Sequence, residues 1–154
     1  MPHIHISLQP GRFAEHERHA LAEKLTSSIL AAEGLPETPT TRALTLIVVD
    51  EAGPATWHVA GEYAEQREEL HAFVRITTFA SLLDPAKRAA MLDAVNTVIV
   101  DAAGGDPLGG LGIWVVIDEI ADGSWGVAGN PIGQRELQIV NDGRFPPSPR
   151  GRVA

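Results

Sequence analysis

The sequence contains no cysteine among its 154 residues. This absence excludes disulfide bonds, thiolate catalysis and cysteine-based zinc sites. Basic residues are also scarce, because 12 Lys and Arg stand against 20 Asp and Glu, which gives a formal net charge of −8. Nucleic acid is therefore not an expected partner, since phosphate binding needs a basic surface. A small anionic ligand remains compatible, because one buried arginine can dominate the field around it.

Long apolar runs are missing as well. No uninterrupted apolar stretch approaches the length that spans a membrane. The N-terminus lacks a basic region followed by an apolar one, so no secretion signal is predicted and a cytoplasmic location is the default. Hydrophobic residues nevertheless make up 44% of the chain, which is enough to bury a core within one compact domain.

The first 49 residues have the pattern of a strand, a helix and a second strand. Apolar residues alternate with polar ones over 3–8, which is typical of a strand. From 14 to 32 the apolar period becomes helical, and Gly34 and Pro36 end the helix. A β-branched run over 44–49 predicts the second strand. Such a βαβ unit has parallel strands and a right-handed crossover.

The same order returns later in the chain. A charged surface connector is predicted over 62–69, and a strand over 71–78. Asp84 and Pro85 form a typical helix start, with aspartate as the cap and proline at the first helical position. Gly104 and Gly105 end that helix, and the Val- and Ile-rich segment 113–120 predicts a fourth strand.

An internal duplication links the two units. Segment 48–61 reads V-V-D-E-x5-W-x-V-A-G and segment 116–129 reads V-I-D-E-x5-W-x-V-A-G, at a constant offset of 68 positions. The helix ends correspond at an offset of 71, and the three-residue difference falls in a loop, where a change of length is tolerated. Repetition of a supersecondary unit predicts one architecture built twice.

The fold class that follows is α/β, as a tandem βαβ repeat. It forms a four-stranded mixed sheet with two helices on one face. Residues 1–133 are predicted to form a single domain with units at 2–61 and 71–129. Residues 134–154 are expected to add an edge strand, at 136–140, and a flexible tail. The other sheet face is fairly apolar and needs cover, which indicates an oligomer.

Several of these features together resemble the tautomerase superfamily, and 4-oxalocrotonate tautomerase in particular. They are the Met-Pro start, a first strand followed by Gly11-Arg12, a long helix, and a second strand that runs into Glu and then Trp-x-Val-x-Gly. The resemblance covers residues 2–129. The doubled length is similar to fused members such as cis-3-chloroacrylic acid dehalogenase and malonate semialdehyde decarboxylase. It implies a homotrimer that acts on a small carboxylate without a cofactor or metal.

The resemblance also implies site residues. The catalytic base of the family matches Pro2, and its carboxylate-binding arginine matches Arg12. Its aromatic wall matches Trp57 in the first unit and Trp125 in the second.

The position of the family's second substrate arginine holds Leu46 in one unit and Trp114 in the other. Arg42 and Arg75 are the candidates to replace it, although neither matches the motif. The motifs of the specialised members are missing too. Segment 81–83 lacks the decarboxylase's Arg-Pro-Arg, and Ile29 stands where the cis-dehalogenase has a histidine. Generic tautomerisation is the expected chemistry.

Pro2 supplies that chemistry only if Met1 is removed, because only then does it carry a free secondary amine. A general base works best with a pKa near the operating pH, and burial or a nearby cation lowers the pKa of an amine. Neutral Pro2 would move a proton along an unsaturated 2-keto or 2-hydroxy acid, while Arg12 holds the carboxylate. The alternatives are a dehalogenase, hydratase or decarboxylase on the same scaffold, or a silent trimer that binds a small acid and retains Met1.

The remaining polar residues have structural interpretations. His3 and His5 share one strand face, but neither His58 nor His71 completes a metal site with convincing spacing, so a sheet-lining position is favoured. At the helix-based offset of 71, Phe73 and Leu83 occupy the places of Pro2 and Arg12 in the second unit. One functional pocket per chain is therefore expected, at the N-terminal unit.

Overall fold

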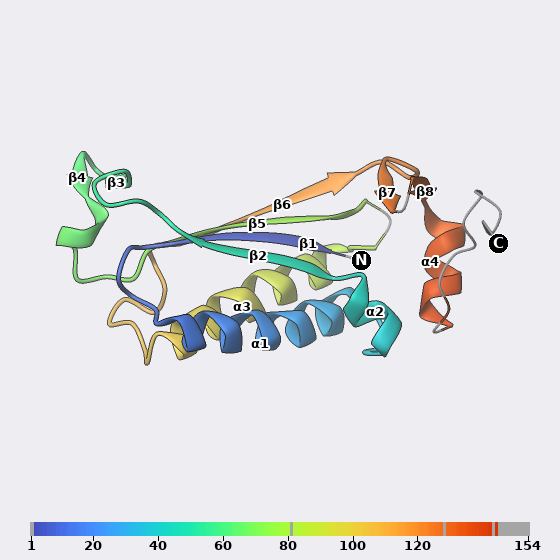
Figure 1. Ribbon diagram of the computed structural model, residues 1–154, viewed down its shortest axis with the longest axis horizontal. Coiled ribbons are helices and arrows are strands. Elements are labelled where there is room, and N and C mark those ends of the chain that lie inside the picture. The colour runs from blue at the N-terminus through green and yellow to red at the C-terminus, as the bar shows by residue number, and fades with distance from the viewer. Residues whose placement is uncertain (1, 81, 128, 143, 145–154) are drawn as a thin grey trace, which may run out of the picture.

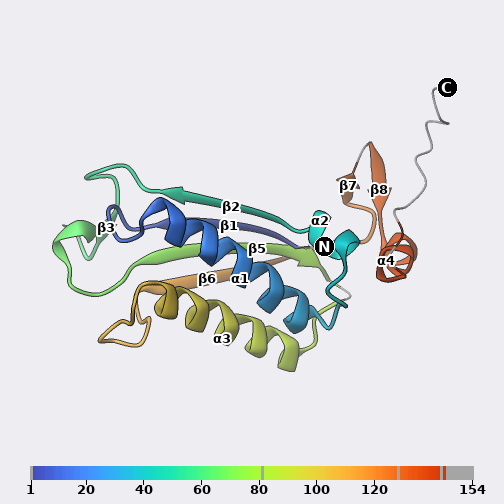
Figure 2. The same ribbon diagram turned by 60° about the horizontal axis from the view of Figure 1, so that its bottom comes forward.

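The structure, a computed structural model, describes residues 2–80, 82–127, 129–142 and 144. Four strands form one sheet in the spatial order β2-β1-β5-β6. They are β1 (His3–Leu8), β2 (Leu46–Glu51), β5 (Ala72–Phe79) and β6 (Ile113–Ile120). The long helices α1 (Glu15–Glu33) and α3 (Pro85–Ala102) lie side by side on one face (Figure 1, Figure 2). The predicted mixed sheet with two helices on one face is confirmed.

The sheet combines two parallel pairs through one antiparallel pair. β1 pairs with β2, and β5 with β6, in parallel, as the two βαβ units require. β1 and β5 meet in the middle and run antiparallel, with His5 opposite Arg75. The two units are therefore related by a pseudo-twofold axis near this residue pair. The strand starts of the two units therefore lie at opposite ends of the sheet, whereas residues near the axis lie close together.

The hydrophobic core fills the layer between the sheet and the two helices. The three apolar residues of β1, Ile4, Ile6 and Leu8, have no exposed surface, and the helix residues Leu25 and Ile29 are equally buried. The alternation along β1 directs one side-chain set into this layer. The same packing recurs in the second unit, where Val74 and Ile76 meet Met91, Val95 and Ile99.

The loops contain elements that the sequence analysis did not predict. A short helix, α2 (Pro39–Ala43), precedes β2, with the Thr38 side chain capping its first turn. Each unit ends in a hairpin at the tryptophan motif. These hairpins are β3 (His58–Val59) with β4 (Glu62–Tyr63), and β7 (Trp125–Val127) with β8 (Asn130–Ile132). The predicted connector over 62–69 thus includes β4 and the single helical turn Ala64–Gln66.

The prediction of an edge strand at 136–140 is wrong. The segment forms helix α4 (Gln134–Asn141). The carboxylate of Glu136 accepts a hydrogen bond from the Gly133 backbone N–H, which supports the helix start. Leu137 and Val140, one helical turn apart, pack into a second apolar cluster with Phe79. The tail over 145–154 lies outside the described residues.

The sheet face opposite the helices is open in the single chain. Its apolar residues include Trp114, which is 68% exposed, and Leu46, which is 57% exposed. Val48, Val116 and Phe73 add to the same face. Exposed apolar area of this kind is typical of a protein interface. Among the helices that the structure describes, none is long and apolar enough to cross a membrane.

The core packing predicts the effect of a cavity mutation. Ile29 has no exposed surface and packs between α1 and the sheet, so Ile29→Ala should lower the free energy of unfolding by about 2–5 kcal/mol. Leu92→Ala, on the exposed side of α3, is the control and should cost less than about 1 kcal/mol. Urea denaturation at one fixed protein concentration measures both. Equal losses in the two variants would contradict the assigned core.

Candidate functional site

The two ends of the sheet carry the two groups of predicted site residues. Figure 1 shows the β3–β4 hairpin at one end, and the β7–β8 hairpin with α4 at the other. The start of β1 lies at the β7–β8 end, next to α2. The antiparallel arrangement of the units thus places the N-terminal strand start beside the hairpin of the second unit.

Pro2 is buried at that end, immediately before β1. Its carbonyl oxygen accepts a hydrogen bond of 3.2 Å from the backbone N–H of Leu46, which fixes the strand start against β2. Trp125 belongs to the same end. Its ring centroid lies 6.5 Å from that of His3 and 5.9 Å from that of Phe79. Of the two predicted aromatic walls, Trp125 is the one near Pro2.

Arg12 lies at the opposite end of the sheet from Pro2. The six residues of β1 separate them, a length of about 20 Å at the usual rise of a strand. The Arg12 guanidinium donates to the backbone oxygen of Glu68 and, at 3.4 Å, to Oε1 of Gln9. Within one chain Arg12 therefore does not lie beside the Pro2 nitrogen, because the two residues flank opposite ends of the same strand.

A cavity of about 490 Å³ also lies at the Arg12 end, and Pro2 is not among its lining residues. Its walls come from both units. The lining residues are Ser7, Ala52, Thr56, Trp57, His58, Val59, Ala60, His71, Phe73, Gly112 and Trp114. Trp57 therefore belongs to this cavity, while its repeat partner Trp125 belongs to the Pro2 end.

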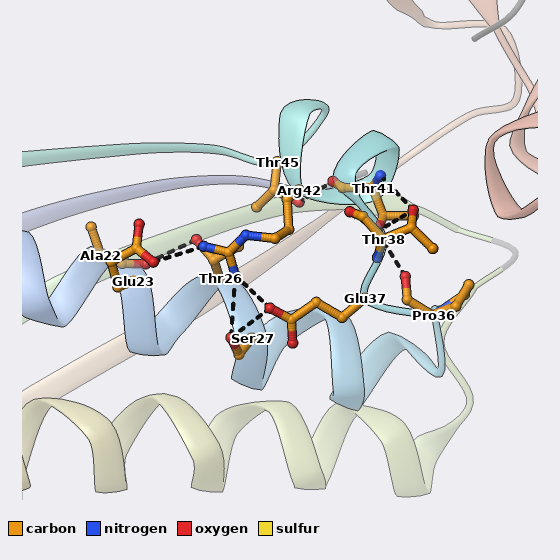
Figure 3. Close-up of polar contacts among 10 residues, drawn as sticks. All are labelled: Ala22, Glu23, Thr26, Ser27, Pro36, Glu37, Thr38, Thr41, Arg42 and Thr45. Carbon is orange, nitrogen blue, oxygen red and sulfur yellow. Dashed lines mark hydrogen bonds and ion pairs between the residues drawn. The ribbon is translucent and has the colours of Figure 1, made fainter. Parts of the chain in front are cut away.

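Arg42 lies near the start of β2, but its side chain points toward helix α1 (Figure 3). The guanidinium pairs with Glu37 and, at 2.7 Å, with Glu23, and it lies 3.5 Å from the hydroxyl of Ser27. The hydrogen bond with Arg42 is the main cause that lowers the pKa of Glu37. Binding of a substrate carboxylate by Arg42 would have to replace these contacts.

Arg75 lies on the open sheet face, with 61% of its side chain exposed, and pairs with Asp118. The pseudo-twofold axis relates this pair to His5 and Asp50, whose Nε2 and Oδ2 atoms are 2.7 Å apart. The Asp118 hydrogen bond is the main cause that raises the pKa of Arg75. In each unit the aspartate of the repeated motif thus pairs with one basic side chain on the open sheet face.

The histidines do not converge on a metal site. No group of three His, Cys, Asp or Glu side chains is placed to hold a metal ion in the part of the chain that the structure describes. His3 and His5 contact Trp125 and Asp50 respectively.

The sheet register refines the comparison of the two units. Since β1 and β2 pair as β5 and β6 do, the first strands correspond at an offset of 70. Ala72 therefore takes the place of Pro2, and Leu82 the place of Arg12. The expected Phe73 and Leu83 are each one residue too late, because the second unit has one more residue between its first strand and the end of its helix. The second unit still lacks the proline and the arginine.

The family model described as "Tautomerase enzyme" matches residues 73–135, which begin in β5 and end in α4. The second βαβ unit therefore matches the tautomerase family. The resemblance predicted from the first strand and the repeated tryptophan motif is confirmed. No curated protein matches the sequence.

Several solved structures share the fold over most of the chain. A fused 4-OT that forms a symmetric trimer has a TM-score of 0.69 at 22% identity, covering 86% of this chain and 96% of that one. Pt0534, inactivated by 2-oxo-3-pentynoate, has a TM-score of 0.70 at 15% identity, with 88% and 98% covered. N1, of the cis-3-chloroacrylic acid dehalogenase family, has a TM-score of 0.69 at 19% identity, with 88% of both chains covered. At these identities the likeness shows the fold alone.

Sequence reasoning missed the cavity and its most buried polar group, His71. His71 was considered only as a metal ligand, although it precedes the first strand of the second unit. Gly112 is the second residue that marks this buried imidazole. A Cβ at this position would lie 2.4 Å from Nδ1 of His71 and 2.4 Å from the backbone oxygen of Leu70. Only glycine fits here, because no side-chain atom can be placed so close to both groups.

Asp106 holds this end of the fold together. Its carboxylate accepts hydrogen bonds from the backbone N–H groups of Leu70, at 2.9 Å, and Gly110, at 2.7 Å. Burial raises the pKa of Asp106, but these hydrogen bonds, another from Leu108 and the charge of Arg12 together outweigh it. The pKa therefore lies below its usual range.

We expect Asp106→Asn to lower the free energy of unfolding by about 1 kcal/mol at pH 7. A lowered folded-state pKa stabilises the protein above the unfolded pKa of about 3.9, and this contribution is lost as the pH falls through the folded value. The difference from wild type should therefore shrink toward pH 3. Urea midpoints at pH 7 and at several acidic values measure this. Asp93→Asn, exposed on α3, is the control, and a pH-independent difference for Asp106→Asn would contradict the assignment.

Proposed function

We propose that the protein is a cofactor-independent tautomerase in which Pro2, freed by removal of Met1, acts as the general base. The placement of Pro2 carries this proposal. It is buried at the start of a central strand, at the same end as Trp125, in a chain whose second unit matches the tautomerase family. Burial disfavours a charged ammonium, so a free amine here is more readily neutral near pH 7 and able to accept a proton.

The substrate class is a small unsaturated 2-keto or 2-hydroxy carboxylate. Neutral Pro2 takes a proton from the carbon beside the keto group, which leaves a dienolate. The same nitrogen then returns the proton to a carbon further along the conjugated chain, so that the product is an isomer. An arginine that binds the carboxylate stabilises the charge as it spreads through the dienolate.

We infer that this arginine comes from a neighbouring subunit. Within one chain Arg12 is at the far end of β1 from Pro2, and Arg42 is engaged with Glu23 and Glu37. Arg75 lies on the open sheet face. The apolar residues of that face support association through it, and a similar fused 4-OT is a symmetric trimer. We therefore propose a homotrimer in which Arg12 or Arg75 of one chain completes the Pro2 site of another.

The proline mechanism has a direct test. Pro2→Ala should lower kcat/KM for ketonisation of 2-hydroxymuconate or phenylenolpyruvate by at least about a hundredfold, because the base is lost. Pro54→Ala, in an exposed loop, is the matched control and should keep wild-type rates. Intact mass should show that Met1 is absent. A mass that includes Met1, or equal rates for wild type and Pro2→Ala, would reject the mechanism and favour the silent acid-binding trimer.

The shared site has a complementation test. Pro2→Ala and Arg12→Ala chains should each be inactive alone, whereas trimers that mix them should regain a fraction of the activity. Mixing restores sites in which an intact Pro2 faces an intact arginine of a different chain. The same experiment with Arg75→Ala decides between the two arginines, and light scattering on each variant checks that it remains a trimer. Inactive mixtures with both arginine variants would show that no cross-subunit arginine is used.

A further inference from the structure

The cavity at the Arg12 end is lined by neither Pro2 nor Arg12 of its own chain, yet it has the dimensions of a ligand site. Its volume of about 490 Å³ falls within the range for small-molecule pockets. The first unit contributes Trp57 and the start of its hairpin, and the second contributes Phe73 and Trp114. Trp114, at 68% exposure, lies on the open sheet face, so the cavity reaches that surface.

One buried polar group in this cavity lacks a partner. His71 is only 4% exposed, and its Nε2 makes no hydrogen bond to any residue that the structure describes. The Oε1 atom of Glu69 is 3.6 Å away, which is too far for a hydrogen bond. Gly112 leaves the space that the imidazole occupies. An unpaired buried nitrogen is costly, so the arrangement favours an additional hydrogen-bonding partner.

The charge of the lining decides the ligand class. Among the described residues that line the cavity there is no Lys, Arg, Asp or Glu. Arg12 lies at this end, but its guanidinium donates to Gln9 and to the backbone of Glu68, and Arg12 does not line the cavity. A carboxylate would therefore enter without a cation to pair with it, which is unfavourable in a pocket of mostly apolar walls.

We propose that this cavity is a second ligand site, distinct from the Pro2 site, which binds a small, planar, uncharged aromatic molecule through one hydroxyl or carbonyl group at His71. The ring of the ligand packs against the indoles of Trp57 and Trp114 and the ring of Phe73. Its polar group hydrogen-bonds to Nε2, which is fully buried in the unliganded chain, so the imidazole must turn toward the cavity on binding. The proposed tautomerase substrate is a carboxylate, so the two sites differ in ligand charge.

A pair of probes tests this on the intact, assembled protein. 4-Hydroxyacetophenone is planar and uncharged, and 4-hydroxybenzoate has a similar size but carries a carboxylate. Calorimetry, together with quenching of tryptophan fluorescence, should show binding of the first probe and at least about tenfold weaker binding of the second. Wild type and Pro2→Ala should bind the neutral probe equally, so a failure of the proline mechanism leaves this result untouched.

Two variants locate the site. His71→Gln should raise the Kd for 4-hydroxyacetophenone about tenfold, which is the loss of one hydrogen bond of about 1.4 kcal/mol. Trp57→Ala, in the hairpin loop, should raise it by a similar factor, and it serves as the second readout if His71→Gln does not fold by circular dichroism. His19→Gln, exposed on α1, is the matched control and should bind as wild type does.

Three outcomes overturn the proposal. The first is that neither probe binds the assembled protein, as expected if a second copy of the chain fills the cavity. The second is that the folded His71→Gln and Trp57→Ala variants bind like wild type. The third is that 4-hydroxybenzoate binds as tightly as the neutral probe and is weakened by His71→Gln to the same extent.

Discussion

The antiparallel pairing of β1 with β5 is the constraint on which the rest of the structure depends. It joins two parallel βαβ units into one sheet with α1 and α3 on the same face. Because the units run in opposite directions, each brings its own strand start to the hairpin of the other. The start of β1 therefore lies at the end where the ring of Trp125 approaches that of His3, and His71 lies with Trp57 at the opposite end.

The two ends of the sheet are built from the same repeated unit, but their side chains differ chemically. Ala72 replaces the proline in the second unit, and Leu82 replaces the arginine. A strand start in the middle of a chain has no free amine, whatever residue occupies it. The end at which β5 begins instead has an imidazole with an unpaired nitrogen, a glycine that makes room for it, and three aromatic side chains. The pseudo-twofold symmetry of the fold is thus kept, while the chemistry at its two ends is not.

The open sheet face connects both ends. Basic side chains near its centre, His5 and Arg75, are each held by an aspartate of the repeated motif, Asp50 and Asp118. Apolar side chains surround these pairs. Covering such a face in an oligomer would bury the apolar area and could bring an arginine of one chain to Pro2 of another. Within a single chain Arg12 and Pro2 are a strand length apart.

The sequence by itself determined the units and their order. Alternation over 3–8, the helical period over 14–32 and the repeat at an offset of 68 are local patterns, and local patterns specify strands, helices and their connection. The bounds of β6, at 113–120, were predicted correctly for the same reason. The fold and the resemblance to the tautomerase superfamily followed from these features.

Only the tertiary structure decided which residues share a site. Pro2 and Arg12 are ten positions apart in the sequence. Because an extended strand fills most of that interval, the two residues lie far apart in space. The helix at 134–141 depended on packing against Phe79, a contact across more than fifty positions. The cavity around His71 likewise requires side chains from both units. Contacts of this kind arise from the direction in which β5 runs against β1, which no local pattern of residues encodes.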